Sequence, residues 1–331
     1  MNQDLEKWLN WAWRNRQEIM RRAQQDGRGN RLPERDLRRP ANVRGFGNNR
    51  GTQMIYSYYT GALGGQVTEN LTAQEARDPD LNQFALQMAM TKLELSSFQV
   101  DLQRDTTYSN LSVSTLEQMH LEYVAGGFFH FIKAPMPTNQ RVYVNLKPVG
   151  RGRSFRRLLS MIKDVPGLDR AKVAAPGLRD ADGNVFDRAD TVVIYMRDET
   201  AQTAVVDALR DFNRANRTLF RAQLPRLVRP VEGLVGVGCA SEPPSVQILR
   251  VNGNTYFQQS SQSFGAYRSE IIFAALEGAL RSNSRMPDFL RLRWFKQRAA
   301  KLLRHGGVDP KNPALQGDYK GNLVQIVDRG N

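Results

Sequence analysis

The sequence predicts an α+β protein in which helices pack on a mostly antiparallel sheet, preceded by a mainly helical N-terminal region. Three observations lead to this prediction. Apolar residues before residue 125 recur at helical spacing, short apolar runs typical of strands follow residue 126, and helix-forming segments separate these strands. The order strand, strand, helix occurs twice, which is typical of helices on one face of an antiparallel sheet.

The composition is that of a soluble globular protein. The chain has 331 residues, of which 40% are hydrophobic, and this is enough for one large core or two modest ones. No segment approaches the roughly 18 uninterrupted apolar residues of a membrane helix, and the N-terminus lacks the basic start and apolar core of a secretory signal. The single cysteine, Cys239, excludes an internal disulfide. We therefore expect a protein of a reducing cytoplasm without a membrane partner, although export without a cleaved signal would leave the same composition.

The charge is strongly positive and unevenly distributed. The 47 Lys and Arg exceed the 33 Asp and Glu by 14, and residues 14–50 alone hold eleven arginines and four acidic residues. Clustered arginine attracts nucleic acid, an anionic membrane or a phosphorylated peptide, because long-range attraction does not distinguish between anions. No nucleic-acid-binding motif accompanies the charge, so we do not expect a nucleic-acid partner. A solvated cationic surface is an equally good interpretation.

Three segments make up the mainly helical N-terminal region. Residues 1–25 combine tryptophans with helix-forming residues, which predicts a helix whose aromatic side packs on the body of the protein or on a partner. Residues 26–52 are rich in Arg and Gly and predict a mobile cationic loop. Residues 53–125 are a predicted helical region, because apolar side chains over 79–102 have the spacing of a long buried helix and residues 112–123 favour another.

Residues 126–315 form the predicted α+β domain, followed by a C-terminal tail over 316–331. Residues 128–133 (FFHFIK) and 141–147 (RVYVNLK) predict two strands that pair with each other. The later predicted elements, in order, are a helix over 151–163, strands over 171–174 and 191–196, a helix over 200–212, a strand over 246–251, a helix over 263–280 and an amphipathic helix within the basic block 281–311.

No motif for a metal or a nucleotide is complete. The segment DADGNVFD at 180–187 begins like a calcium-binding loop, but Val185 stands where that loop needs glycine and Thr191 where it needs glutamate. A hairpin turn is the better interpretation. The segment GLVGVG at 233–238 has the wrong glycine order for a dinucleotide fingerprint, and GRGRS at 150–154 lacks the P-loop lysine. We therefore expect no cofactor and no metal.

Three basic side chains remain as candidates for a functional site, because each lies at the end of a predicted element or among small residues. Lys147 ends a predicted strand, Lys172 lies among small residues in another, and Arg268 lies near the start of a helix that Ser263 is expected to cap. Gly265 permits close approach of the backbone there, so this helix start is a candidate site for an anion such as phosphate. The alternative for each cation is an ordinary solvent-exposed position.

Histidine is scarce, with three in the chain. His130 lies on a predicted strand between aromatic residues. A lone histidine on a strand is more often a hydrogen-bonded core residue than a catalytic one, and both interpretations are open.

Four blocks resemble the HopA-type family of type III secretion effectors. Their order and spacing are those of the family, and together they cover about residues 125–315, whereas residues 1–75 show no such resemblance. The blocks are RVYVNLKPVGRGRSFRRLLSMI, AKVAAPGLRDADGNVFDRADTVVIYM, SFGAYRSEIIFAALEGAL and GVDPKNPAL.

The resemblance implies a lyase-like fold and activity. The family's α+β fold is similar to that of phosphothreonine lyases, and family members also occur as the lyase component of class V lanthipeptide and thioamitide biosynthesis, beside a separate kinase. Both relatives eliminate phosphate from phosphoserine or phosphothreonine and leave dehydroalanine or dehydrobutyrine. The implied partners are therefore a phosphorylated peptide or protein and a separate kinase.

The resemblance also implies roles for particular residues. Lys172 resembles the base that removes the alpha proton, and Arg268 matches the arginine of the Ser-Phe-Gly-x-x-Arg block, which binds phosphate in a bidentate manner. Lys147 adds positive charge as phosphate leaves. Phosphothreonine lyases carry a histidine on the strand similar to RVYVNL, where this chain has Val144 and Asn145, so His130 is the candidate substitute for the acid.

The competing prediction is a protein without catalysis. Because the strand histidine is missing and the N-terminal region is large, the chain is alternatively an effector or peptide-binding partner that docks on a host immune regulator or a kinase. Its place of action is then the bacterial cytoplasm or, as the alternative, a host cell reached through a type III system.

Overall fold

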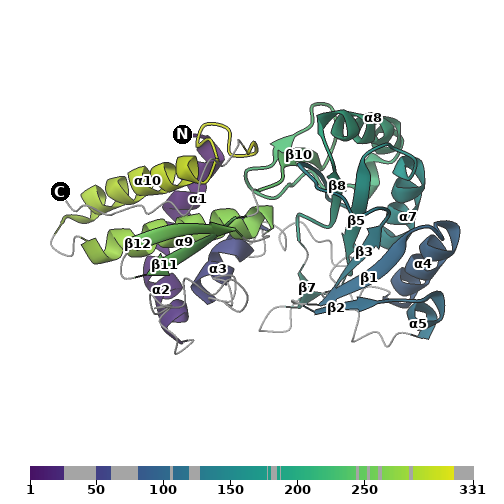
Figure 1. Cartoon of the computed structure of the whole chain (residues 1–331), viewed down its shortest axis with the longest axis horizontal. Helices are drawn as coiled ribbons and strands as arrows, with labels where there is room; N and C mark the ends of the chain where they lie inside the picture. Colours follow the sequence, from purple (N-terminus) through teal and green to yellow (C-terminus); the bar gives the residue numbers. More distant parts are fainter. Residues whose placement is uncertain are drawn as a thin grey trace. The chain divides into compact units, whose positions relative to one another are not determined.

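The computed structural model describes residues 1–25, 50–60, 81–104, 107–118, 127–176, 178–179, 185–186, 188–243, 246–251, 254–259, 263–282 and 286–316. The chain forms two compact units (Figure 1), of which unit 1 comprises Met1–Tyr59 and Ser241–Asn331 and unit 2 comprises Thr60–Ala240. Most of the predicted Arg/Gly loop, most of the segment 180–187 and nearly all of the predicted C-terminal tail lie outside the described residues.

Unit 2 is built on an eight-stranded sheet with the strand order β2-β1-β3-β5-β8-β4-β10-β9. The neighbours β1 and β2, β1 and β3, β3 and β5, β5 and β8, β4 and β8, and β9 and β10 are antiparallel. A separate ribbon pairs β6 with β7. The strands are β1 (Gln99–Arg104), β2 (Thr107–Asn110), β3 (Phe128–Ile132), β4 (Gln140–Val144), β5 (Leu168–Ala174), β6 (Leu178–Arg179), β7 (Val185–Phe186), β8 (Val192–Met196), β9 (Arg229–Pro230) and β10 (Val237–Ser241).

Helices of unit 2 cover one face of this sheet (Figure 1). They are α4 (Leu81–Glu94), α5 (Val113–Gln118), α7 (Arg151–Ile162) and α8 (Glu199–Ala215), with a 3-10 turn, η3 (Arg217–Leu219), after α8. Their apolar stripes meet alternate side chains of the strands in one core that includes Phe129, Phe131, Val142, Phe155, Val192 and Ile194. The predicted α+β class, with helices on a mostly antiparallel sheet, is confirmed.

The long helix predicted over 79–102 is wrong in its second half. Helix α4 ends at Glu94, and Gln99–Arg104 form strand β1. Phe98, Val100 and Leu102 are buried in the core, so buried residues recur at every second position, as in a strand. The spacing of Phe98 from the preceding leucines also suits a helix. The apolar content does not change between the helix and the strand, so the sequence pattern gave no sign of where the helix ends.

The two strands predicted to pair with each other do not pair. Strand β3 (FFHFI) lies between β1 and β5, and strand β4 lies beyond β8, so β5 and β8 separate them. The connection over residues 133–139 contains two prolines and is longer than a typical hairpin loop. It crosses to a distant position in the sheet instead of closing a hairpin.

Unit 1 combines helices with a β-hairpin. The predicted N-terminal helix is interrupted at Asn15, whose side-chain amide donates to the carbonyl of Trp11 at 2.8 Å, so α1 and α2 are separate. The predicted strand over 246–251 is present and pairs with a strand that was not predicted. The elements are α1 (Gln3–Arg14), α2 (Arg16–Gln25), α3 (Arg50–Tyr59), β11 (Val246–Val251), β12 (Asn254–Gln259), α9 (Phe264–Ser282) and α10 (Asp288–His305).

The N-terminal tryptophans pack inside unit 1. Trp8 is fully buried with its ring 5.8 Å from that of Tyr59, and the Trp11 ring stacks on Tyr58 with centroids 4.2 Å apart. Trp13 lies 5.7 Å from the ring of Phe295 on α10. The aromatic side of α1 therefore belongs to the core of this unit. No helix among the described residues is both long and apolar enough to cross a membrane.

Candidate functional site

The sheet of unit 2 has a polar face on the side opposite its helical core. Side chains alternate between the two faces of a strand, and residues paired across neighbouring strands lie on the same face. The register pairs His130 with Lys172, and Lys172 with Val193. We use the name polar face for the described residues that this register places together: Asp101, Gln103, Phe128, His130, Arg141, Tyr143, Arg170, Lys172, Val193 and Tyr195.

His130 is the most deeply buried histidine of the described chain, with 4% of its surface exposed. Its Nε2 lies 2.8 Å from Oε1 of Gln103, which assigns the proton to Nε2 because the amide oxygen only accepts. Burial, and to a smaller extent the charges of Lys172 and Arg170, lower the pKa of His130 to about 2. The imidazole is therefore neutral near pH 7.

Lys172 lies opposite His130 and against aromatic rings. Its Nζ is 4.4 Å from the ring centroid of Phe128 and 5.9 Å from that of Tyr195, both within cation–π range. Arg170, on the same strand, also lies over the Tyr195 ring, at 4.7 Å. The half-buried Lys172 is thus held beside the imidazole by rings on β3 and β8.

Two further cations border the same aromatic rings. The guanidinium of Arg141 lies 4.7 Å from the ring of Tyr195 on the face away from the core. Arg188 lies 4.9 Å from the ring of Phe128 and makes a bidentate ion pair with Asp190 at 2.7 and 2.8 Å. Sequence reasoning missed Arg141, Arg170 and Arg188. A signal for Arg141 was present in RVYVNLK, where apolar and polar residues alternate. This alternation places Arg141 on the face of the strand opposite Val142.

Lys147 follows β4 at the end of the sheet where β5 ends. Thr191 connects these strands, because its hydroxyl bonds to Leu146 N and Val144 O while its carbonyl accepts from Ala174 N. The backbone N–H of Lys147 donates to the carbonyl of Leu219 at 2.9 Å. Lys147 therefore belongs to the same unit as Lys172, with β8 between their strands.

Val144 and Asn145, which stand where the resemblance implies a strand histidine, have structural roles in this chain. Val144 is part of the hydrophobic core. Asn145 is buried, and its side-chain amide donates to the carbonyl of Gln223 at 2.7 Å. Neither side chain supplies an acid, which leaves His130 as the histidine on this sheet within the described residues.

Arg268 belongs to unit 1, whereas Lys147, His130 and Lys172 belong to unit 2. Its fully buried guanidinium donates to the carbonyl of Pro313 through Nε (3.0 Å) and Nη2 (2.8 Å) and to Phe264 O at 3.3 Å. Two of the family-like blocks, SFGAYR and GVDPKNPAL, therefore meet through this arginine.

The predicted start of the Arg268 helix is confirmed. The hydroxyl of Ser263 accepts from the N–H of Ala266 at 3.3 Å, as expected of an N-cap. A Cβ on Gly265 would lie 2.3 Å from Cε1 of Tyr59, so the close approach expected at this glycine is made by an aromatic ring.

Metal and thiol chemistry have no evident site in the described part of the chain. No group of three His, Cys, Asp or Glu residues there could hold a metal ion. Burial raises the pKa of the Cys239 thiol to about 11, so it is protonated at neutral pH.

Comparison with known proteins identifies a family. The model of the HopA1 effector protein family matches residues 122–315. A solved effector protein from Pseudomonas syringae pv. tomato strain DC3000 is 19% identical, with a TM-score of 0.48 over 81% of this chain and 90% of that chain. One from Pseudomonas syringae pv. syringae strain 61 is 16% identical, with a TM-score of 0.49 over 81% and 98%. No curated protein matches the sequence.

Proposed function

The chain belongs to the HopA1 effector protein family, and on this premise we propose that it is a phospho-Ser/Thr lyase that eliminates phosphate from a phosphorylated peptide or protein. Membership of this family makes the chain an effector of the type III kind. The lyase activity is what we propose in addition. The observation that carries it is the pairing of Lys172 with a neutral His130 on the polar face.

In the proposed reaction Lys172 is the base. Lys172, whose charge lowers the pKa of His130 in the free protein, acts as the base only after it has given up its own proton. The deprotonated amine then takes the alpha proton of the phosphorylated residue, and the electron pair of that C–H bond forms the double bond between Cα and Cβ. The bond between Cβ and the phosphate oxygen breaks, and phosphate leaves with that electron pair. The proton passes from the lysine to solvent, which leaves dehydroalanine from phosphoserine or dehydrobutyrine from phosphothreonine.

The leaving phosphate needs positive charge close by. The proposal assigns this role to Lys147, which belongs to the same unit as Lys172. Bidentate binding of phosphate by Arg268, which belongs to unit 1, stays a prediction from the resemblance. In the structure the Arg268 guanidinium bonds to the carbonyl of Pro313, so contact with phosphate requires this bond to open. Arg170, which stacks on the same ring as Lys172, is a further cation on the polar face.

His130 fits the role of the acid only if bound phosphate raises its pKa. At a pKa of about 2 the imidazole donates a hydrogen bond through Nε2 but is not an imidazolium near neutral pH. A phosphate dianion beside the ring would favour the charged form and shift the pKa upward. The low pKa of His130 in the free protein favours the second candidate function. This is a non-catalytic effector that binds a peptide, a kinase or a host immune regulator.

The place of action follows from the family. Effectors act in a host cell after secretion, and we propose this setting over the bacterial cytoplasm that the single cysteine predicts. The partners are then the phosphorylated host protein or peptide and, for a biosynthetic member, a separate kinase.

Intact mass spectrometry of a panel of phosphoserine and phosphothreonine peptides tests the proposal. The unmutated protein should remove phosphoric acid, whereas Lys172→Ala should leave the peptides unchanged but bind them with nearly the same affinity. The matched control is Lys163→Ala, which removes a half-buried lysine just after α7 and should keep full activity. Release of phosphate that leaves a plain hydroxyl would indicate a phosphatase. No mass change in any peptide, with peptide binding retained, would favour the non-catalytic function.

A further inference from the structure

A groove runs between α4, α7 and α8 on the helical side of unit 2. Its volume is about 660 Å³, and it opens to solvent. The residues that line it are Gln87, Met90 and Glu94 on α4, Arg153, Arg156, Arg157, Ser160 and Met161 on α7, and Phe212 and Asn216 at the end of α8. The polar face with Lys172 is on the other side of the sheet, so this groove takes no part in the function proposed above.

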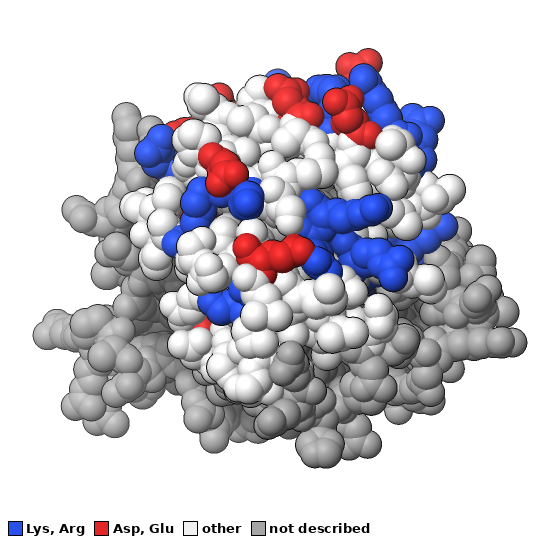
Figure 2. All heavy atoms as spheres, turned by 90° about the vertical axis from the view of Figure 1, so that its right-hand side faces the viewer, with Lys and Arg blue, Asp and Glu red and all other residues white. Residues whose placement is uncertain are grey.

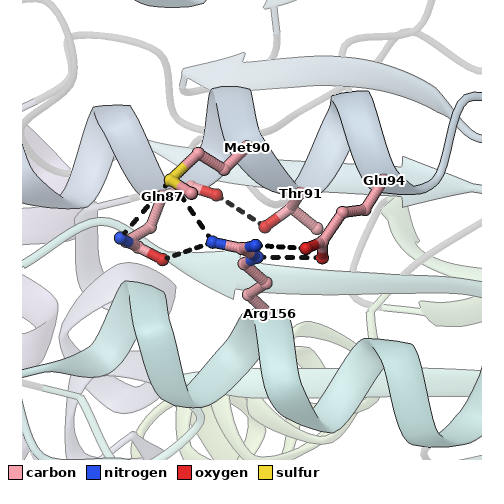
Figure 3. Close-up of polar contacts among 5 residues, drawn as sticks. All are labelled: Gln87, Met90, Thr91, Glu94 and Arg156. Atoms are coloured by element: carbon pink, nitrogen blue, oxygen red, sulfur yellow. Dashed lines mark hydrogen bonds and ion pairs between the residues drawn. The ribbon is translucent and has the colours of Figure 1, made fainter.

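One arginine ties two walls of the groove together (Figure 3). Arg156 on α7 donates through Nε to Oε2 of Glu94 at 2.8 Å, and its Nη2 donates to the other carboxylate oxygen. Its Nη1 lies 3.3 Å from Sδ of Met90 and 3.5 Å from Oε1 of Gln87. The ion pair lowers the pKa of Glu94, so the carboxylate is charged and already neutralised by Arg156. The groove is therefore formed before any partner arrives.

The remaining charge of the groove is positive. Three arginines and one glutamate line it, which leaves +2. Arg153 and Arg157 are one turn apart on α7 and exposed, and they make no hydrogen bond or ion pair with the described part of the chain. Figure 2 shows this side of the molecule, where several Lys and Arg side chains lie near the centre with acidic side chains among them. Two unpaired guanidinium groups at one rim favour a partner with carboxylates at matching spacing.

Apolar side chains also line the groove. They are Met90, Met161 and Phe212, and Met161 is 42% exposed although it is a large hydrophobic residue. Methionine adapts to different apolar partners because its side chain is unbranched and polarisable. Phe212 is only 8% exposed, so a flat bilayer surface would not reach it, whereas an inserted side chain would.

We propose that this groove is a docking site for an acidic amphipathic segment of a partner protein. One or two of the segment's apolar side chains contact Met90, Met161 and Phe212, and its carboxylates pair with Arg153 and Arg157. The volume is within the roughly 300–1,000 Å³ of binding pockets, and a helix that lays its apolar side into a groove between helices is a common mode of peptide recognition. Because the polar face is on the other side of the sheet, a docked partner does not contact it.

Fluorescence anisotropy tests the proposal with the full chain and a labelled helical peptide made of Glu and Leu. The double variant Arg153→Glu and Arg157→Glu should bind this peptide at least about tenfold more weakly, which corresponds to about 1.4 kcal/mol. The matched control is Arg197→Glu with Arg214→Glu, which changes the net charge equally at exposed positions outside the groove and should bind normally. Met161→Ser should weaken binding about threefold without changing its salt dependence.

Three results would overturn the docking site. They are equal loss of affinity in both double variants, equal affinity for a peptide made of Lys and Leu, and absence of binding. Binding to vesicles that contain phosphatidylserine, lost in the Arg153 and Arg157 double variant, would assign the patch to a membrane instead. Lys172→Ala should bind the acidic peptide normally, so failure of the lyase proposal and failure of this one are distinguishable.

Discussion

His130 on β3 lies directly opposite Lys172 on β5, in a position where burial and then the charge of Lys172 hold the pKa of the imidazole at about 2. The neutral imidazole thus lies beside two cations of the same face, Lys172 and Arg170. The amide of Gln103 keeps the ring in one orientation through its bond to Nε2. The charge state of His130 is therefore a direct probe of this site.

The first prediction concerns stability against pH. The pKa of His130 is about 2 in the folded chain and near 6.5 in the unfolded chain. Between these values the unfolded state binds a proton that the folded state does not, so the free energy of unfolding falls as the pH drops below 6.5. From pH 7 to pH 5 the loss from this group is about 2 kcal/mol. Urea denaturation at both pH values should show that His130→Gln loses about that much less than the unmutated protein. An equal loss in both proteins would mean that His130 titrates normally.

The second prediction separates two roles of Arg268. Its side chain is fully buried and bonds to Pro313 O and Phe264 O. Replacement by alanine should lower the free energy of unfolding by about 3 kcal/mol, because a buried carbonyl loses a charged donor. Exposed Arg281→Ala is the control and should cost less than about 1 kcal/mol. Phosphopeptide affinity should also fall in the Arg268 variant, and Arg268→Lys should recover little of it. Unchanged affinity in the folded variant would restrict Arg268 to a structural role.

The third prediction compares two tryptophans of α1. Trp8 is fully buried beside Tyr59, whereas Trp11 is half-buried and stacks on Tyr58. We expect Trp8→Ala to destabilise the protein by about 4 kcal/mol and Trp11→Ala by about 1 kcal/mol. Guanidinium denaturation followed by circular dichroism measures both. If neither variant changes the midpoint, the helix packs on a partner and not on its own unit.

The fourth prediction concerns the ion pair between α4 and α7. A double-mutant cycle with Arg156→Met and Glu94→Gln should give a coupling energy of about 0.5–1 kcal/mol, because both side chains are partly exposed. The coupling should decrease in 1 M salt, where screening is strong. The pair of Arg210 and Asp207 on α8 is the control, with an expected coupling nearer 0.3 kcal/mol. A cycle without coupling would show that Arg156 does not tie the walls of the groove.

Sequence periodicity located most elements of unit 2 and of the C-terminal helices correctly. Helices α7, α8, α9 and α10 and strands β3, β5, β8 and β11 all overlap their predicted ranges. Periodicity failed at β1, where the apolar spacing suited two structures, and strands β2, β9, β10 and β12 were not predicted. Local patterns report burial on one side of an element, and they do not report which element provides that burial.

The candidate site was predicted only in part. Lys172 and His130 were singled out separately from their neighbours in sequence, and the structure places them opposite each other. Arg141, Arg170 and Arg188 were not singled out, because an isolated arginine on a strand is indistinguishable from a solvated one until its neighbours are known. Arg268 was expected near a helix start that is free to bind an anion. In the structure its guanidinium already donates two hydrogen bonds to the carbonyl of Pro313.

The sequence by itself determined the α+β class, the family, the capped start of α9 and the absence of a long apolar segment, because each depends on residue types at short spacing. Tertiary structure alone decided the strand order, the meeting of His130 with Lys172, and the bond between Arg268 and Pro313. The reason is physical: the same alternation of side chains is compatible with several strand orders. Only the burial of apolar surface between residues far apart in the chain selects one of them.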